Sequence, residues 1–311
     1  MEKIILKNSD LEVPRLCVGG CPFGGYGWGE FSNDDFAMAI EFAIDNGFNF
    51  FDTADVYGLG DSERLLGECF KNKRDKVIIA TKFGVVFDYS SKGYNNSPKF
   101  IKRAIEGSLK RLQTDYVDLY QIHYRDNETP LGDVVETLNS LKEEGKIRYF
   151  GLSNIHEDNI DEIKPFVNTF VSFQNEYSLA CRKNEKDMQF FSNEYNMTPF
   201  TWGSLGQGVL TGKYDKNVTF ETNDRRRRTE YVNFHGKKLL HNLQIVDEMR
   251  KISKEINKPI SAIAIRFILD YLKDSVVLVG VKSKKQMEDN AFALNWNLTK
   301  EQIEILDKIS R

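Results

Sequence analysis

Four polar residues stand at the end of a short apolar segment or in the loop directly after one: Asp52, Tyr57, Lys82 and His123. Each alone has an ordinary structural explanation, as a loop cap, a packed ring, a solvated lysine or a hydrogen-bonded histidine. Together they follow three successive apolar segments, the first of which carries both Asp52 and Tyr57. If these segments are strands whose ends meet, the four side chains would converge on one site.

These four residue types can protonate a carbonyl oxygen. A tyrosine hydroxyl has a reference pKa of about 10, which is too high for efficient proton transfer near neutrality. We expect the Lys82 ammonium to stabilise the Tyr57 phenolate and lower that pKa, and Asp52 to hold Lys82 in place and protonated. His123 would donate a hydrogen bond to the carbonyl oxygen. Because the sequence has no visible metal-ligand cluster, the natural attacker on the carbonyl carbon is a hydride from a nicotinamide.

The elements that must position these residues alternate along the chain. Strands are expected over Pro14–Val18, Phe48–Asp52, Val77–Lys82, Tyr116–His123, Ile147–Ser153, Phe170–Gln174, Met197–Thr201 and Ser275–Gly280. Helices are expected over Phe36–Asn46, Ser62–Phe70, Pro98–Leu112, Pro130–Glu144, Glu157–Val167, Glu185–Tyr195, Lys237–Ile256 and Ile260–Lys273. A short hairpin is expected in Met1–Leu11, and two further helical segments close the chain.

Eight short buried strands alternating with helices predict a parallel α/β fold. Two architectures fit this pattern, a (β/α)8 TIM barrel and an open doubly wound sheet. The first strand ends in VGGCPFGGYG, which does not match the G-x-G-x-x-G fingerprint of a dinucleotide-binding sheet. The strand count and the missing fingerprint both favour the barrel. The sequence has no internal linker, so we expect a single domain over residues 1–311.

Composition limits the classes of function. The 311 residues are 41% hydrophobic, with a net charge of -3, whereas nucleic-acid-binding domains are usually basic. No segment is apolar enough for a signal peptide or a membrane span. The four cysteines have the spacing of neither a zinc site nor a disulfide framework. We therefore expect a cytoplasmic protein whose partner is a small carbonyl compound, and neither nucleic acid nor membrane.

Eight motifs, in order and at matching spacing, resemble the aldo-keto reductase family over nearly the whole chain. They are FDTADVYG (Phe51–Gly58), SERLLG (Ser62–Gly67), IATKFG (Ile79–Gly84), SLKRLQTDYVDLYQIH (Ser108–His123), GKIRYFGLSN (Gly145–Asn154), FQNEYSL (Phe173–Leu179), LGQGVLTGKY (Leu205–Tyr214) and GVKSKKQMEDN (Gly280–Asn290). Within the family, the sequence looks most similar to the bacterial general-stress and inositol-utilisation type of reductase.

The resemblance implies a (β/α)8 barrel that binds NADPH in an extended form, with Tyr57 as the general acid of a catalytic tetrad. It implies a nicotinamide site made by Gly20, Cys21, Asp52, Ser153, Asn154, Gln174 and Trp202. It implies a pyrophosphate site made by Ser204, Leu205, Gly206 and Lys213, and an adenosine site made by Gly280, Lys282, Gln286 and Asn290. By the same resemblance Arg226 is a candidate phosphate ligand, the alternative being a solvated arginine run.

The residue types agree with several of these assignments. Serine and asparagine side chains can satisfy both polar atoms of a carboxamide, and an indole stacks well on a planar ring. Lys282 comes just before an expected helix start, where an anion is favoured, and Lys284 and Lys285 follow it. This cluster favours the extra phosphate of NADP, although Lys284 and Lys285 fit a solvated run equally well.

Other assignments of the same residues stay open. Some relatives serve as cofactor-sensing subunits of potassium channels, so a regulatory role is an alternative to catalysis. A lyase or aldolase with Lys82 as a Schiff base is another, although it leaves Tyr57 and His123 without roles. Candidate walls of a substrate pocket, each of which could instead be core packing, are Phe23, Tyr26, Trp28, Phe83, Phe87 and Tyr89.

Overall fold

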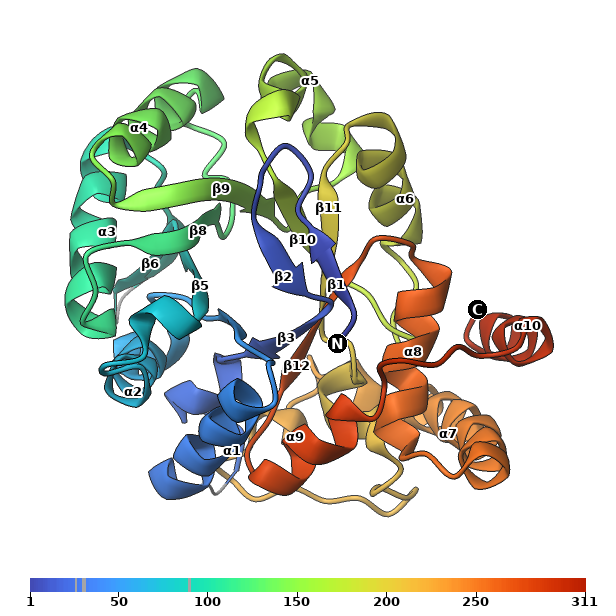
Figure 1. Cartoon of the computed structure of the whole chain (residues 1–311). Coiled ribbons are helices and arrows are strands. Elements are labelled where there is room, and N and C mark those ends of the chain that lie inside the picture. The colour runs from blue at the N-terminus through green and yellow to red at the C-terminus, as the bar shows by residue number, and fades with distance from the viewer. Residues whose placement is uncertain (26, 30–31, 89–90) are drawn as a thin grey trace.

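A computed structural model describes residues 1–25, 27–29, 32–88 and 91–311, apart from the side chains of residues 87, 88, 91 and 92. In this part of the chain, parallel strands close into an eight-stranded barrel with helices around it (Figure 1). The strands are β3 (Leu16–Gly19), β4 (Phe50–Asp52), β5 (Ile78–Phe83), β8 (Val117–Ile122), β9 (Ile147–Ser153), β10 (Ser172–Glu176), β11 (Thr198–Trp202) and β12 (Val276–Gly280). Because β12 pairs with β3, the sheet is closed, which confirms the predicted (β/α)8 barrel and excludes the open sheet.

Helices follow the strands and cover the outside of the barrel. They are α1 (Asn33–Asp45), α2 (Asp61–Cys69), α3 (Pro98–Leu112), α4 (Leu131–Glu143), α5 (Ile160–Ile163), α6 (Glu185–Glu194), α7 (Gly236–Ile256), α8 (Ile260–Tyr271), α9 (Lys284–Ala291) and α10 (Lys300–Ile309). The main apolar core lies between these helices and the strands. Two helices, α7 and α8, separate β11 from β12, and α10 is appended after α9.

A second apolar cluster fills the inside of the barrel and closes its N-terminal end. Its members include Cys17, Phe50 and Leu119 from the strands, together with Leu6 and Leu11 from the N-terminal hairpin. The hairpin strands are β1 (Lys3–Ile5) and β2 (Glu12–Pro14), which lie across the barrel centre in Figure 1. With this end plugged, the C-terminal ends of the strands are left for a site, as is usual in such barrels.

The N-terminal hairpin, one helix and one inserted hairpin differ from the sequence prediction. The hairpin extends to Pro14, so the first barrel strand begins at Leu16 rather than at Pro14. The helix predicted over Glu157–Val167 is wrong as a single helix, because α5 is flanked by 3-10 turns η4 (Glu157–Asn159) and η5 (Lys164–Thr169). Pro165 has no backbone N–H to continue the helical bonds. An unpredicted hairpin, β6 (Val85–Asp88) and β7 (Ser91–Tyr94), lies between β5 and α3.

No helix within the described residues is long and apolar enough to cross a membrane.

Candidate active site

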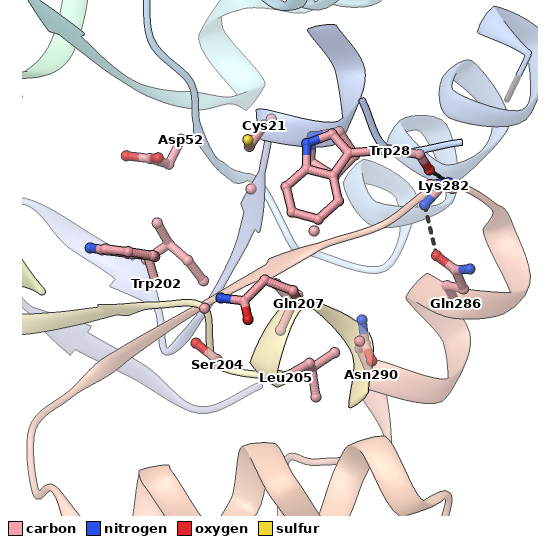
Figure 2. A pocket seen from close by; sticks show the side chains of 18 of the residues that line it. Cys21, Trp28, Asp52, Trp202, Ser204, Leu205, Gln207, Lys282, Gln286 and Asn290 are labelled. Atoms are coloured by element: carbon pink, nitrogen blue, oxygen red, sulfur yellow. Dashed lines mark hydrogen bonds between the residues drawn. The ribbon is translucent and has the colours of Figure 1, made fainter. Parts of the chain in front are cut away.

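A cavity of about 770 Å³ opens at the C-terminal end of the barrel. In Figure 2, Asp52 and Trp202 lie toward one end of it, and Lys282, Gln286 and Asn290 lie toward the other. The residues predicted from the sequence that line this cavity are Gly20, Cys21, Asp52, Tyr57, His123, Ser153, Asn154, Gln174, Trp202, Ser204, Leu205, Lys213, Arg226, Gly280, Lys282, Gln286 and Asn290. Lys82 and Gly206 are not on its wall.

Lys82 lies beneath the cavity and contacts both the Asp52 carboxylate and the Tyr57 hydroxyl. Its side chain is fully buried, and Nζ forms an ion pair with Asp52 Oδ1. The same nitrogen donates to the Thr53 carbonyl at 2.9 Å and lies 3.4 Å from the Tyr57 hydroxyl. His123 stands on the other side of Tyr57, with the two rings edge to face at 5.8 Å. The four residues predicted to converge therefore do so.

The pKa values of Tyr57 and His123 shift in opposite directions. Burial, followed by the nearby Cys21 and Asp52, raises the pKa of Tyr57 well above its ordinary value. The sequence-based expectation that Lys82 lowers this pKa is therefore wrong. The Lys82 ammonium is paired with the Asp52 carboxylate, so its field at the phenol is largely offset, and burial dominates. Burial and the Lys82 charge hold the pKa of His123 well below its ordinary value, so both side chains are neutral at pH 7.

The second oxygen of Asp52 is held by two amides. Gln121 Nε2 donates to Asp52 Oδ2 at 2.9 Å, and Gln174 Nε2 donates to the same oxygen at 3.0 Å. Gln121 pairs in register with Lys82 across β5 and β8. Sequence reasoning missed Gln121, although it stands two residues before His123 in a buried strand and so points to the same face. Gln174 was predicted only as a nicotinamide ligand.

The predicted carboxamide site forms a connected set of polar groups. Asn154 Nδ2 donates to the His123 carbonyl at 3.0 Å and to Ser153 Oγ at 3.1 Å. Trp202 Nε1 donates to Asn154 Oδ1 at 3.2 Å, which fixes the indole at the end of β11. Ser153 Oγ donates to the Gln174 carbonyl at 3.1 Å. These bonds hold Ser153, Asn154 and Gln174 at one end of the cavity, where an amide-bearing ligand could bind them.

Positive charge gathers at the opposite end of the cavity. Burial first, and then Arg226 and Lys213, lower the pKa of Lys282, while Asp224 opposes this shift. Arg226 is itself tied to Asp224 by a pair of side-chain bonds, the Nη2–Oδ2 contact being 2.5 Å. Lys282 Nζ donates to the Trp28 carbonyl, and Lys282 N donates to Gln286 Oε1 at 2.8 Å. These three cations outnumber the two carboxylates at this end, Asp224 and Asp289, and leave a net positive site that fits an anion, such as the phosphates of a dinucleotide.

Tight turns bring backbone up to the cavity. Gly206 has φ 56°, and a Cβ there would approach Ala180 and Val209 at 2.9 Å, so it acts in packing below the wall. The next residue, Gln207, lines the cavity despite φ 55°, which is unusual for a residue with a side chain. Its amide donates to Glu176 Oε1 at 3.2 Å and accepts from Asn233. Figure 2 shows Gln207 across the cavity from Trp28.

Of the predicted substrate walls, only Trp28 is found on the cavity among the described residues. Phe23 packs on Phe36 at 4.8 Å and Phe83 packs on Tyr120 at 4.6 Å, so both belong to the core. Tyr26, Tyr89 and the side chain of Phe87 lie outside the part that the structure describes. The residues that line the cavity without having been predicted as substrate walls include Tyr124, Arg225 and Tyr231.

Comparison with known proteins gives a consistent result. A sequence model of the aldo/keto reductase family matches residues 15–311. The chain is 32% identical to the aldo-keto reductase YhdN of Bacillus subtilis, over 97% of this chain and 91% of that protein. It is 30% identical to the NADP(+) aldo-keto reductase yakc of Schizosaccharomyces pombe, over 93% and 89% of the two chains. The solved glycerol dehydrogenase AKR11B4 from Gluconobacter oxydans matches with a TM-score of 0.87 and 30% identity, over 99% of this chain and 94% of that one.

Proposed function

Because the chain belongs to the aldo/keto reductase family, we propose that it reduces an aldehyde or ketone to an alcohol, with NADPH as hydride donor and Tyr57 as general acid. The observation that carries this proposal is the position of Lys82 Nζ, which touches both Asp52 and the Tyr57 hydroxyl beneath one end of the cavity. Bound NADPH would supply the hydride for the carbonyl carbon.

The residues of this chain would bind and protonate the carbonyl oxygen. Because the pKa of Tyr57 is raised, its hydroxyl keeps the proton that reduction requires. Neutral His123 would donate a second hydrogen bond and fix the oxygen between the two side chains. As Tyr57 gives up its proton, negative charge develops on Oη, which lies 3.4 Å from the Lys82 ammonium. That charge is therefore stabilised more in the transition state than in the ground state.

The cofactor would lie along the cavity with its nicotinamide near Ser153, Asn154, Gln174 and Trp202. Its phosphates would meet the three cations at the other end, of which Lys282 is the ligand we assign to the 2′-phosphate. The preference for NADPH over NADH follows from this charge, since NADH has no phosphate at that position. An extended cofactor bound in this way would also explain why one cavity reaches from the tetrad to Lys282.

A Schiff-base lyase fits the geometry poorly. Lys82 Nζ is buried, lies off the cavity wall, and is bound by Asp52 and the Thr53 carbonyl, so a carbonyl carbon could reach it only if these contacts broke. Trapping with borohydride and a carbonyl compound would give no covalent adduct if the reductase proposal is correct.

The direct test is consumption of NADPH with a panel of aldehydes and ketones, followed by its absorbance and by identification of the alcohol. The proposal expects turnover of at least one carbonyl compound. Tight binding of NADPH without turnover of any compound would instead favour the regulatory-subunit alternative.

A further inference from the structure

A stack of three rings runs from the surface of the protein to the catalytic histidine. The ring of His123 lies face to face with that of Tyr124, with centroids 5.1 Å apart and planes 20° apart. The ring of Tyr124 also stacks on that of Tyr94, with centroids 4.8 Å apart and planes 22° apart. Tyr94 is 50% exposed, Tyr124 lines the cavity, and His123 is 8% exposed. The Tyr124 ring therefore connects the exposed ring of Tyr94 with the buried ring of His123.

The His123 ring has no hydrogen bond at Nδ1 to orient it. Nδ1 is buried and has no partner in the described structure. Histidines with a chemical role usually have their orientation set by a bond to this second nitrogen. The backbone of His123 is fixed by its N–H bond to the Phe83 carbonyl at 2.8 Å, but this bond leaves the ring free to rotate about χ1 and χ2. The ring orientation must therefore come from packing, and Tyr57 supplies only an edge-to-face contact.

Tyr94 is tied firmly to the segment that carries His123 and Tyr124. It pairs with Val85 in the β6–β7 hairpin, and the next residue, Asn95, donates its N–H to the Gly84 carbonyl at 2.9 Å. One residue further, Asn96 Nδ2 donates to the Tyr124 carbonyl at 3.1 Å. These links hold Tyr94 against Tyr124 even though half of its ring is exposed. The end of β7 at Tyr94 therefore supports the stack through these backbone and side-chain bonds.

We propose that Tyr94 and Tyr124 are positioning residues for His123, which fix the imidazole plane and keep water from it. Only the expected effect on kcat rests on the proposed carbonyl reduction; the expected change in the pKa of His123 does not. With Nδ1 unpaired, the tautomer of lowest cost carries its proton on Nε2, because an unpaired donor would otherwise be buried. The stack holds that N–H where it can meet a carbonyl oxygen beside Tyr57.

The first test needs no substrate. The imidazole signals of the unliganded protein are titrated by NMR, and the four histidines are assigned by single substitutions. Tyr124→Ala and Tyr94→Ala should admit water to His123 and raise its pKa toward the ordinary value, because burial is the main cause of its depression. The Lys82 charge, which faces His123 from β5, remains in both variants and limits the rise. Tyr94→Phe keeps the ring and should leave the pKa unchanged.

The second test is kinetic and uses a matched control. Tyr94→Ala should lower kcat about tenfold, in line with the cost of small misplacements of a catalytic group, and leave the Kd for NADPH unchanged. The acid limb of its pH–rate profile should move to higher pH together with the pKa of His123. Ile5→Ala, on the other hairpin and 57% exposed, should change none of these quantities.

Unchanged titration of His123 in both alanine variants would overturn the proposal. So would equal losses of kcat in Tyr94→Phe and Tyr94→Ala, because the phenyl ring alone should restore the stack. Near-UV circular dichroism checks that each variant is folded. If Tyr94→Ala is not folded, Tyr94→Leu is used instead, because it also removes the ring. If the wild type reduces no carbonyl compound but the His123 titration shifts as expected, the proposed function fails and the positioning role stands.

Discussion

Asp52 is the residue on which the polar contacts of the site converge. Oδ1 meets the Lys82 ammonium and Oδ2 accepts from Gln121 and Gln174, so each carboxylate oxygen has a donor. A buried charge is tolerated when it is paired and hydrogen-bonded in this way. Asp52 can then fix Lys82 against Tyr57 without a bond to solvent. Gln174 also lines the cavity, so it connects Asp52 to the proposed nicotinamide site.

A second carboxyl close to Tyr57 has one oxygen without such a partner. Asp55 Oδ1 is buried with no hydrogen-bond partner in the described structure, and burial together with the Glu63 charge raises the pKa of Asp55 to about 7. Arg111 and Lys82 oppose this shift. The folded protein holds the proton more tightly than the unfolded chain, so stability is lost as pH rises from about 4 through 7.

Asp55→Asn removes this ionisation. The variant should gain about 2 to 3 kcal/mol relative to wild type between pH 5 and pH 8, measured as the difference in free energy of unfolding in urea. Any pH-independent effect of the amide cancels in this comparison. Asp61→Asn, at a side chain 65% exposed in the same segment, serves as control. A constant difference between Asp55→Asn and wild type at the two pH values would contradict the assignment.

At the residue level, the sequence allows the tetrad to be found but not its electrostatics. Asp52, Lys82 and His123 could be predicted because a polar residue at the end of an apolar segment can be recognised from the sequence alone. The direction of the Tyr57 pKa could not, because it depends on burial and on the prior pairing of Lys82 with Asp52. The role of Gln121 could not be predicted for a similar reason. A single amide in a buried strand does not indicate a function until its hydrogen-bond partner, here Asp52, is known.

At the level of elements, two loops approach each other closely beside Tyr57. Gly58 has φ 60°, and a Cβ added there would collide with the backbone of Gly24, in the turn after β3. The contact holds the 3-10 turn η2 (Tyr57–Gly60) against η1 (Cys21–Gly24). Since this turn begins at Tyr57, its position sets that of the phenol.

Gly58→Ala should therefore cost both stability and activity. The left-handed conformation alone costs of order 1–3 kcal/mol, and displacement of Tyr57 should lower kcat about 10- to 100-fold. Thermal unfolding and steady-state kinetics measure the two effects. Gly132→Ala in α4, where a Cβ meets only Phe166 at 3.6 Å, should change neither appreciably. Wild-type kcat in a folded Gly58→Ala protein would show that the close approach does not position Tyr57.

Helices and strands with a clear apolar periodicity were predicted with nearly correct bounds. Segments whose structure depends on a single residue or on pairing with another segment were not. Pro98–Leu112 and Ile147–Ser153 match α3 and β9 because apolar spacing and caps agree there. The segment that contains Pro165 broke into short turns, since one missing N–H outweighs its apolar pattern. The β6–β7 hairpin was missed because its strands pair only with each other, so neither needs a buried apolar face.

For the whole molecule, the cavity joins parts of the chain that are distant in sequence. Trp28 follows the first barrel strand, Arg226 follows the seventh and Lys282 follows the eighth, yet the three meet at the positively charged end of the cavity. The family resemblance predicted the individual cofactor ligands. The net positive charge at the place where they meet could be determined only from the structure. The barrel brings them together because the C-terminal ends of parallel strands share one rim.

This convergence gives a prediction for cofactor choice. Lys282→Ala should raise the Kd for NADPH about 10- to 100-fold, as expected for loss of a bond to a charged group, and leave the Kd for NADH nearly unchanged. Fluorescence titration, with Trp202 as reporter, measures both constants. Lys284→Ala, whose side chain is 54% exposed and whose partner Glu288 does not line the cavity, is the matched control and should affect neither. An equal loss for both cofactors would contradict the 2′-phosphate assignment.

The most direct test of the account is the rate of NADPH-dependent carbonyl reduction by Tyr57→Phe, measured with its affinity for NADPH in the same preparation. Phenylalanine keeps the ring against His123 and removes only the hydroxyl beside Lys82. We expect kcat to fall by about 10²- to 10⁴-fold, the usual contribution of a general acid, while NADPH binds as in wild type. Turnover at the wild-type rate would contradict it, because the proton would then have to come from another group.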